Sequence, residues 1–278
     1  MRTETASPAP AASGRPSARV VSASGRLRAW GQTWGSVLGV LVLFEILSRV
    51  DVLPSRYFPP VSQMFAVLGQ ELATVGFWAA VANTMQGWSI GLGIAVAFGV
   101  PVGMVVGSSR TLYRFVRPLI EFLRPIPSVA LIPLAILIYG TGLQSKVFLV
   151  VFASFWPLLV QSLYGVQDVD PVATDTARVY GLGRLERMVR VQLPGAVPYI
   201  ATGLRLSSAV ALILAVTAEL VIGSPGLGQA INTARSGGAI PLMYALIIAT
   251  GLIGWGLNIV FTRVERRVLH WHPSHREA

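Results

Sequence analysis

The chain has 278 residues, of which 53% are hydrophobic and 12% charged, and it contains no cysteine. A soluble domain carries about a quarter charged residues, so this composition indicates a protein whose surface faces lipid rather than water. It excludes a largely disordered chain, a disulfide scaffold, a thiolate metal site and a cysteine nucleophile. The net charge of +10 would suit nucleic-acid binding, but its meaning depends on where the charges lie.

The N-terminal part divides into a tail, a helix and an external segment. Residues 1–30 are rich in Ala, Ser, Pro and Arg without hydrophobic periodicity, which predicts a disordered basic tail. Residues 31–77 hold a first membrane helix at 34–50 and an external segment with a short interfacial helix at 61–72. No small-residue cleavage site follows the helix, so we expect it to be retained rather than removed as a signal peptide.

Five further apolar stretches follow, each close to the ~20 residues that a membrane-spanning helix needs. They lie at 78–106, 118–139, 147–166, 199–222 and 242–262. The sequence therefore predicts an all-α polytopic membrane protein with six transmembrane helices, a core domain at 78–262 and a C-terminal tail at 263–278 that continues the last helix. The 78–106 stretch carries regularly spaced small residues that predict close packing of another helix: Gly87, Gly91, Gly93, Gly99, Gly103 and Gly107.

The positive charges indicate the orientation of these helices. If the N-terminus is cytoplasmic, most arginines fall in loops on that side, whereas the opposite side and its edges hold Arg49, Arg56, Lys146 and Arg235. Positively charged loops stay in the cytoplasm, so we expect both termini there. The net charge is then explained by topology, and a nucleic-acid partner is not expected.

Polar residues inside the predicted helices are candidates for the translocation pathway, because an ionised side chain at a helix centre costs about 2.5–3.5 kcal/mol. The candidates are Asn83, Gln86, Glu121, Arg124, Pro125, Pro127 and Glu219. Glu121 and Arg124 are spaced to form a local ion pair, which explains them as well as a pathway role does. Asn83 and Gln86 fit hydrogen bonding between helices first and solute contact second. Arg205 lies several helical turns from Glu219 and cannot pair with it.

The prolines of the third predicted helix indicate a break. Pro125, Pro127 and Pro133 remove backbone donors and leave carbonyl groups free. Such an interruption is tolerated where other helices or water satisfy the backbone. We expect a broken helix beside a cavity, in a position suited to a gate.

No catalytic or metal site is expected. Residues 140–146 only partly match a phosphate-binding loop, and Lys146 is the chain's single lysine, so ATP hydrolysis requires a separate polypeptide. His270, His272 and His275 lie in a tail predicted to be solvated, where weak metal affinity is a less favoured alternative. We therefore expect a non-enzymatic subunit that binds no cofactor or metal of its own.

Residues 167–198 form the longest predicted cytoplasmic loop, and its sequence is punctuated like a folded unit. Asp170 and Pro171 suit the start of a helix, and Gly181 suits its C-terminal cap. A second amphipathic helix is predicted at 184–192, closed by Pro194. Two short capped helices predict a compact projection that fits a groove on a partner protein.

This loop resembles the EAA loop of ABC importer permeases, whose pattern is Glu-Ala-Ala, three residues, Gly, nine residues, Ile, one residue, Leu-Pro. The matching positions, with neighbouring Arg178, are Asp175, Thr176, Ala177, Gly181, Val191, Leu193 and Pro194. Asp replaces Glu, Thr replaces Ala and Val replaces Ile, each conservative in charge or size. Residues 124–133, 203–205, 218–219, 226–228 and 265–271 resemble the nitrate, sulfonate and taurine branch of that family.

The resemblance implies a bacterial cell-membrane importer. Two copies of the permease form the pathway, the loop docks on a cytoplasmic ATPase dimer that binds ATP and Mg²⁺, and an external binding protein delivers a small solute such as a sulfonate, taurine or nitrate. We expect the external segments 51–77 and 223–240 to form the landing surface for that protein. A gradient-driven secondary carrier that uses Glu121 and Glu219 remains the alternative, although such carriers often show two related halves and none is visible here.

Overall fold

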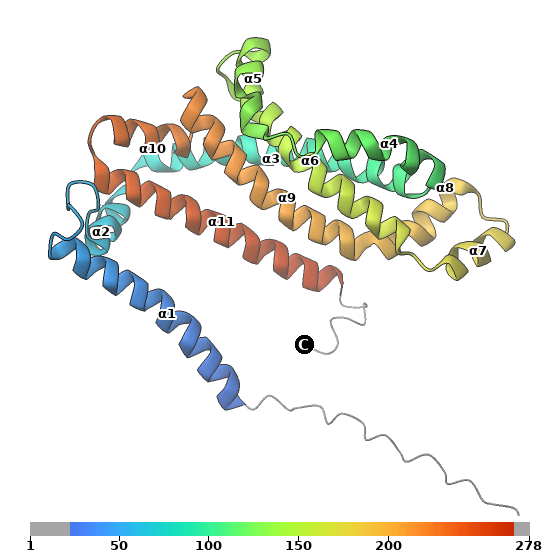
Figure 1. Ribbon diagram of the computed structural model, residues 1–278, viewed down its shortest axis with the longest axis horizontal. Coiled ribbons are helices and arrows are strands. Elements are labelled where there is room, and N and C mark those ends of the chain that lie inside the picture. Colours follow the sequence, from blue (N-terminus) through green and yellow to red (C-terminus); the bar gives the residue numbers. More distant parts are fainter. Residues whose placement is uncertain (1–22, 270–278) are drawn as a thin grey trace, which may run out of the picture.

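The computed structural model describes residues 23–269, with side chains described from residue 35, and this part is helical apart from short connections (Figure 1). The long helices are α1 (Ala23–Arg49), α3 (Val75–Gly107), α6 (Leu143–Gln167), α9 (Leu193–Ile222) and α11 (Ile240–Val268). The shorter ones are α2 (Val61–Glu71), α4 (Arg110–Leu123), α5 (Ile132–Tyr139), α7 (Pro171–Val179), α8 (Arg184–Arg187) and α10 (Leu227–Ser236). A 3₁₀ turn at Ser128–Leu131 precedes α5, and a π-helical segment at Met188–Gln192 joins α8 to α9. The predicted all-α class is confirmed for this part of the chain.

The predicted N-terminal tail is too long. Residues 23–30 belong to α1, so the expectation of disorder is wrong for them. Once the following apolar stretch forms a helix, adding residues to its N-terminal end costs little. No proline lies between residue 16 and the start of that stretch to prevent the extension. Residues 1–22 and 270–278, which include the rest of the tail and the three histidines, lie outside the described residues.

Four helical segments within residues 23–269 are long and apolar enough to cross a membrane: 75–107, 143–167, 184–222 and 240–268. They match four of the six predicted membrane helices. The predicted helix at 118–139 is not continuous, because α4 and the segment Ser128–Tyr139 meet at an angle of 79°. The expected proline break is therefore present, with Pro125 and Pro127 in the connection. The first predicted span lies in α1, some of whose side chains are outside the described set.

The centre of the bundle is formed by α3, α6 and α9, which pack along their length. Glycines of α3 make the close approach to α6 possible. A Cβ atom at Gly103 would overlap the carbonyl group of Leu159, and one at Gly91 would overlap Val150. The predicted small-residue interface is confirmed at five of the glycines, whereas Gly93 faces open space.

The two ends of the bundle are formed by different short helices. Figure 1 shows α2 and α10 together at one end and α7 and α8 at the other. Helix α5 packs through Ile132 and Ala135 against α6 and α9. At the α2–α10 end, Leu68 of α2, Phe77 of α3, Leu227 of α10 and Leu246 of α11 belong to one buried hydrophobic cluster. The segments predicted to lie outside, distant in sequence, are thus brought side by side.

Candidate functional site

The predicted first helix of the long loop is present as α7, with the expected caps. Asp170 Oδ1 accepts a hydrogen bond from the Val172 N–H at 2.8 Å, and Pro171 occupies the first turn. At the other end Gly181 has φ +80°. The Leu182 N–H donates to the Ala177 carbonyl at 3.1 Å, and the Gly181 N–H donates to Arg178 at 3.0 Å. This is the glycine-dependent C-terminal cap that the sequence predicts.

The predicted C-terminal end of the second helix of the loop is wrong. Pro194 does not close it, because the chain is helical without interruption from Arg184 to Ile222. The π-helical segment Met188–Gln192 ends two residues before the proline. Such a segment changes the hydrogen-bond register locally, so a proline shortly after it is tolerated without ending the helix. The loop is therefore continuous with membrane helix α9 rather than separated from it.

The motif residues divide into an exposed face and an anchored base. Asp175, Thr176 and Arg178 are exposed, and the Arg178 guanidinium lies 3.1 Å from the Asp175 carboxylate. Ala177 is buried, Val191 and Leu193 are half-buried, and Gly181 and Pro194 are exposed. Met188 and Leu193 pack against a buried cluster of Met104, Val166 and Ala196, which come from α3, α6 and α9. The helical segment after α7 is thereby seated on the ends of three membrane helices, and α7 itself packs against α8 and the π-helical segment.

At the opposite end of the bundle, an ion pair is buried between α6 and α9. Lys146 Nζ lies 2.9 Å from Glu219 Oε1, and the two side chains are 2% and 0% exposed. The same ammonium group donates to the carbonyl oxygens of Asn83 at 2.9 Å and Pro225 at 3.1 Å. All three ammonium hydrogens thus have acceptors, which a buried charge requires.

The other oxygen of the Glu219 carboxylate connects this pair to α3 and α10. Glu219 Oε2 accepts from the Thr84 hydroxyl at 2.8 Å and from the Gly228 N–H at 3.0 Å. Thr84 Oγ1 in turn accepts from the Leu227 N–H at 2.9 Å. A Cβ atom at Gly226 or Gly228 would overlap the Glu219 side chain. We call Thr84, Lys146, Glu219 and their backbone partners the buried network.

Lys146 was missed as part of this network. The glycines at 140 and 142 suggest a surface turn, but α6 begins at Leu143 and places Lys146 in its first buried turn. The available signal was that the chain's single lysine and Glu219 both adjoin or lie in apolar segments, where a buried charge needs a partner of opposite sign. Arg205, as expected, does not reach Glu219; its guanidinium lies 3.4 Å from Glu265.

The remaining pathway candidates lie at two other places. Glu121 pairs with Arg117 at 2.7 Å, so the local pair with Arg124 that the spacing allows is not the one present. On α4, Arg117 is one full turn before Glu121, whereas Arg124 is already the C-terminal cap residue. Arg124 and Glu121 line a small cavity of about 90 Å³. Pro125 and Pro127 are exposed in the break, and Gln86 is exposed on α3.

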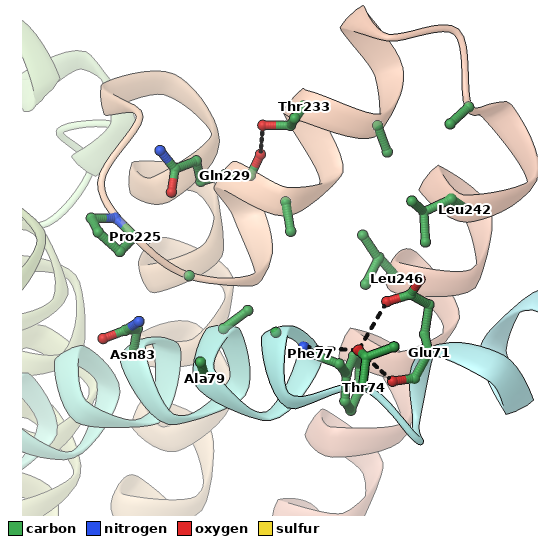
Figure 2. Close-up of a pocket in the computed structure, with 16 residues that line it drawn as sticks. Glu71, Thr74, Phe77, Ala79, Asn83, Pro225, Gln229, Thr233, Leu242 and Leu246 are labelled. Carbon is green, nitrogen blue, oxygen red and sulfur yellow. Dashed lines mark hydrogen bonds between the residues drawn. The ribbon is translucent and has the colours of Figure 1, made fainter.

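A cavity of about 570 Å³ lies between α3, α10 and α11 at the α2–α10 end (Figure 2). Asn83, Gln229 and Thr233 supply polar groups to a lining that otherwise includes Phe77 and Leu246. Figure 2 shows Asn83 and Pro225 on the same side of the cavity. The carbonyl oxygens of both residues accept hydrogen bonds from Lys146 of the buried network. Within the described part of the chain no three His, Cys, Asp or Glu residues are grouped to hold a metal ion.

Comparison with known proteins identifies relatives over most of the chain. The taurine transport system permease protein TauC of Escherichia coli is 31% identical over 243 residues, covering 86% of this chain and 88% of the relative. A putative aliphatic sulfonates transport permease protein, SsuC, of the same species is 28% identical and covers 87% and 92%. The nitrate import permease protein NrtB of Leptolyngbya laminosa is 29% identical and covers 69% of each chain.

Solved structures show the same fold. A chain of the methionine ABC transporter MetNI in an inward-facing conformation matches with a TM-score of 0.61 at 20% identity, covering 68% of this chain and 94% of its own. A chain of a bacterial ABC transporter involved in alginate import matches with a TM-score of 0.57 at 16% identity, covering 86% and 99%.

The family profile described as "Binding-protein-dependent transport system inner membrane component" matches residues 99–270, which include the break, the long loop and Glu219. This match decides against the gradient-driven carrier. The chain belongs to the family of binding-protein-dependent transport system inner membrane components, as a non-catalytic, multi-pass permease subunit of an ABC importer.

Proposed function

We propose that two copies of this chain form the membrane pathway of an ATP-driven importer for a small anion. The carrying observation is the exposed Asp175–Arg178 face of α7, which is capped at both ends and packs against α8 and the π-helical segment. Met188 of that segment contacts the buried cluster formed by α3, α6 and α9. A rigid element in this place transmits closure of an ATPase dimer to the membrane helices as movement of packed bodies. We assign the α7–α8 end and both termini to the cytoplasm, in line with the predicted charge bias.

Docking of the ATPase is tested with two glycine variants in the same loop. Gly181 has φ +80°, a conformation that valine adopts only with strain, so Gly181→Val disrupts the end of α7. Gly183 has φ −62°, and a Cβ atom there meets only a Glu186 oxygen at 4.0 Å, so Gly183→Val is the matched control. We expect the ATPase to co-purify with the wild type and Gly183→Val, and to be lost from Gly181→Val with membrane insertion unchanged.

Retention of the ATPase by Gly181→Val would contradict docking through α7.

Homodimer formation is measured separately, by co-purification of two differently tagged copies of the chain. Failure of that experiment would reject the homodimer while leaving the docking assignment intact.

The α2–α10 end supports the proposed landing surface for the binding protein. Its two segments share one hydrophobic cluster, and α10 carries exposed Arg235, whose guanidinium donates to Asn232 at 2.9 Å. We expect Arg235→Glu to reduce stimulation of ATP hydrolysis by the binding protein and to leave basal hydrolysis unchanged. Full stimulation in this variant would place the landing surface elsewhere.

The nature of the solute rests on the relatives, whose names refer to taurine, aliphatic sulfonates and nitrate. We propose a small organic or inorganic anion of this kind. The test is uptake by a bacterium that expresses the chain with its ATPase and binding protein and lacks its own systems for these solutes. ATP-dependent uptake of taurine, an alkanesulfonate or nitrate is expected, and uptake of a neutral or cationic solute alone would contradict the proposal.

A further inference from the structure

A third cavity, distinct from that in Figure 2 and from the small one beside Glu121, lies at the α7–α8 end and has a volume of about 430 Å³. Its walls come from three parts of the chain: the turn between α3 and α4, helix α7, and α8 with the π-helical segment. The lining residues are Ser108, Ser109, Arg178, Arg184, Arg187, Met188 and Gln192. We call this space the arginine cavity.

The positive charge in the arginine cavity is compensated at only one of its three arginines. Three guanidinium groups line it and no acidic residue does. Arg178 has Asp175 as its partner at 3.1 Å, whereas within residues 35–269 neither Arg184 nor Arg187 forms an ion pair with an acidic side chain. The acidic residue of α8, Glu186, is directed elsewhere: its carboxylate accepts from the Gly183 N–H at 3.2 Å and lies 3.7 Å from Arg190.

The lining also supplies neutral donors suited to an oxyanion. Ser109 Oγ accepts a hydrogen bond from the Leu112 N–H at 3.3 Å, which leaves its own O–H free to donate. Gln192 adds an amide N–H₂ group. Planar guanidinium groups bind the paired oxygens of a phosphate in a bidentate manner, and several around one site match an anion with several oxygens.

We infer that the arginine cavity binds a phosphate group, which holds α7 and α8 against the turn between α3 and α4. A bound anion removes the repulsion between the guanidinium groups and accepts from residues on both sides of the cavity. Two sources carry this chemistry: free phosphate of the cytoplasm, and the phosphodiester of an anionic lipid beside the end of the membrane helix α3. The inference does not depend on docking of the ATPase.

The test uses the full-length chain purified in a zwitterionic detergent and follows its thermal unfolding midpoint. Inorganic phosphate is titrated against chloride at constant ionic strength, and in a second series the micelles contain phosphatidylglycerol or phosphatidylcholine. Binding to the folded state raises the midpoint, and we expect a rise of roughly 2–4 °C for a ligand in several-fold excess over its Kd.

Three variants on one helix distinguish the cavity from general basic charge. Arg184→Gln and Arg187→Gln remove lining guanidinium groups, whereas Arg190→Gln removes the same charge from a residue that is 70% exposed and does not line the cavity. We expect the first two variants to lose most of the shift and Arg190→Gln to keep it.

The pattern of the shift identifies the source of the phosphate group. A cavity-dependent shift with inorganic phosphate supports the free anion, and one that appears only with phosphatidylglycerol supports the lipid headgroup. The inference is overturned if neither probe shifts the midpoint, or if Arg190→Gln loses as much of the shift as the two lining variants.

Discussion

The two ends of the bundle hold the same kinds of charged side chain in opposite environments. At the α2–α10 end, Lys146 and Glu219 are buried and every donor and acceptor is occupied by α3, α9 or the chain entering α10. At the α7–α8 end, Asp175 and Arg178 are each 66% exposed and form a simple i,i+3 pair. Exposed pairs contribute about 0–1 kcal/mol, whereas removal of one member of a buried pair is strongly destabilising.

The difference indicates what each end does. A satisfied buried network holds the segment after α9 in one position, because any displacement separates charges from their partners in a medium of low dielectric. Exposed charges on a capped helix cost little to separate from each other, so they are free to engage a partner. Substitutions in the buried network should therefore act on folding, and those on the exposed face of α7 on assembly.

The largest effect is expected at the buried network. Glu219→Gln leaves the Lys146 ammonium buried without its counter-charge, which typically costs about 3–5 kcal/mol. The double variant Lys146→Met, Glu219→Gln removes the unpaired charge and should recover most of the loss. Thermal unfolding midpoints of the purified chain measure both effects. A double variant as unstable as Glu219→Gln would show that the charge is not the cause.

Thr84→Val tests the hydrogen bonds of the network at nearly constant side-chain volume. The substitution removes the donor to Glu219 and the acceptor for the Leu227 N–H, so we expect a loss of about 1.5–3 kcal/mol. Thr250→Val is the matched control, because the Thr250 hydroxyl bonds only to the Leu246 carbonyl one turn earlier in its own helix. Equal losses in the two variants would argue against a special role of the network.

Asp175→Asn should show the opposite behaviour at the other end. It removes an exposed charge whose pair is worth less than about 1 kcal/mol, so the unfolding midpoint should hardly change. We expect weaker co-purification of the ATPase and slower ATP-dependent uptake, since α7 presents this charge outward. Normal assembly and uptake would indicate that the acidic group is not part of the docking face.

The smallest effect on folding is expected for Glu121→Gln. Glu121 and Arg117 are both exposed on α4, and their pair joins two turns of the same helix. The unfolding midpoint should be unchanged within error. If α4 lines the pathway, the apparent KM for uptake should change, and unaltered uptake kinetics would leave Glu121 as a residue of a local ion pair.

Much of the architecture was predictable because it depends on local patterns. Asp170, Pro171 and Gly181 specify the ends of α7 through backbone groups within one or two turns. The glycines of α3 predicted a close helix contact, since only small residues allow it. The prolines predicted the break between α4 and α5, because a proline removes a donor wherever it stands.

The errors come from features that depend on distant or variable partners. Pro194 was expected to end a helix, and the π-helical segment before it allows the helix to continue. The spacing allows Glu121 to pair with Arg124, but Arg124 lies beyond the last residue of α4 and Glu121 pairs instead with Arg117 one turn earlier. Lys146 follows two glycines that favour a surface turn, and the acceptors that surround it in the folded chain come from α3, α9 and the segment before α10.

The apolar helices, the caps of α7 and the family motif around Asp175 and Gly181 are predictable from the sequence, because each arises from residues close together in the chain. Only the tertiary structure decided that Thr84, Lys146 and Glu219 share one buried site, and that Ser109, Arg178 and Arg187 line one cavity. The buried network and the arginine cavity escape prediction from the sequence for the same reason. The stability of a charge depends on which groups surround it in space, and packing of helices far apart in sequence chooses those groups.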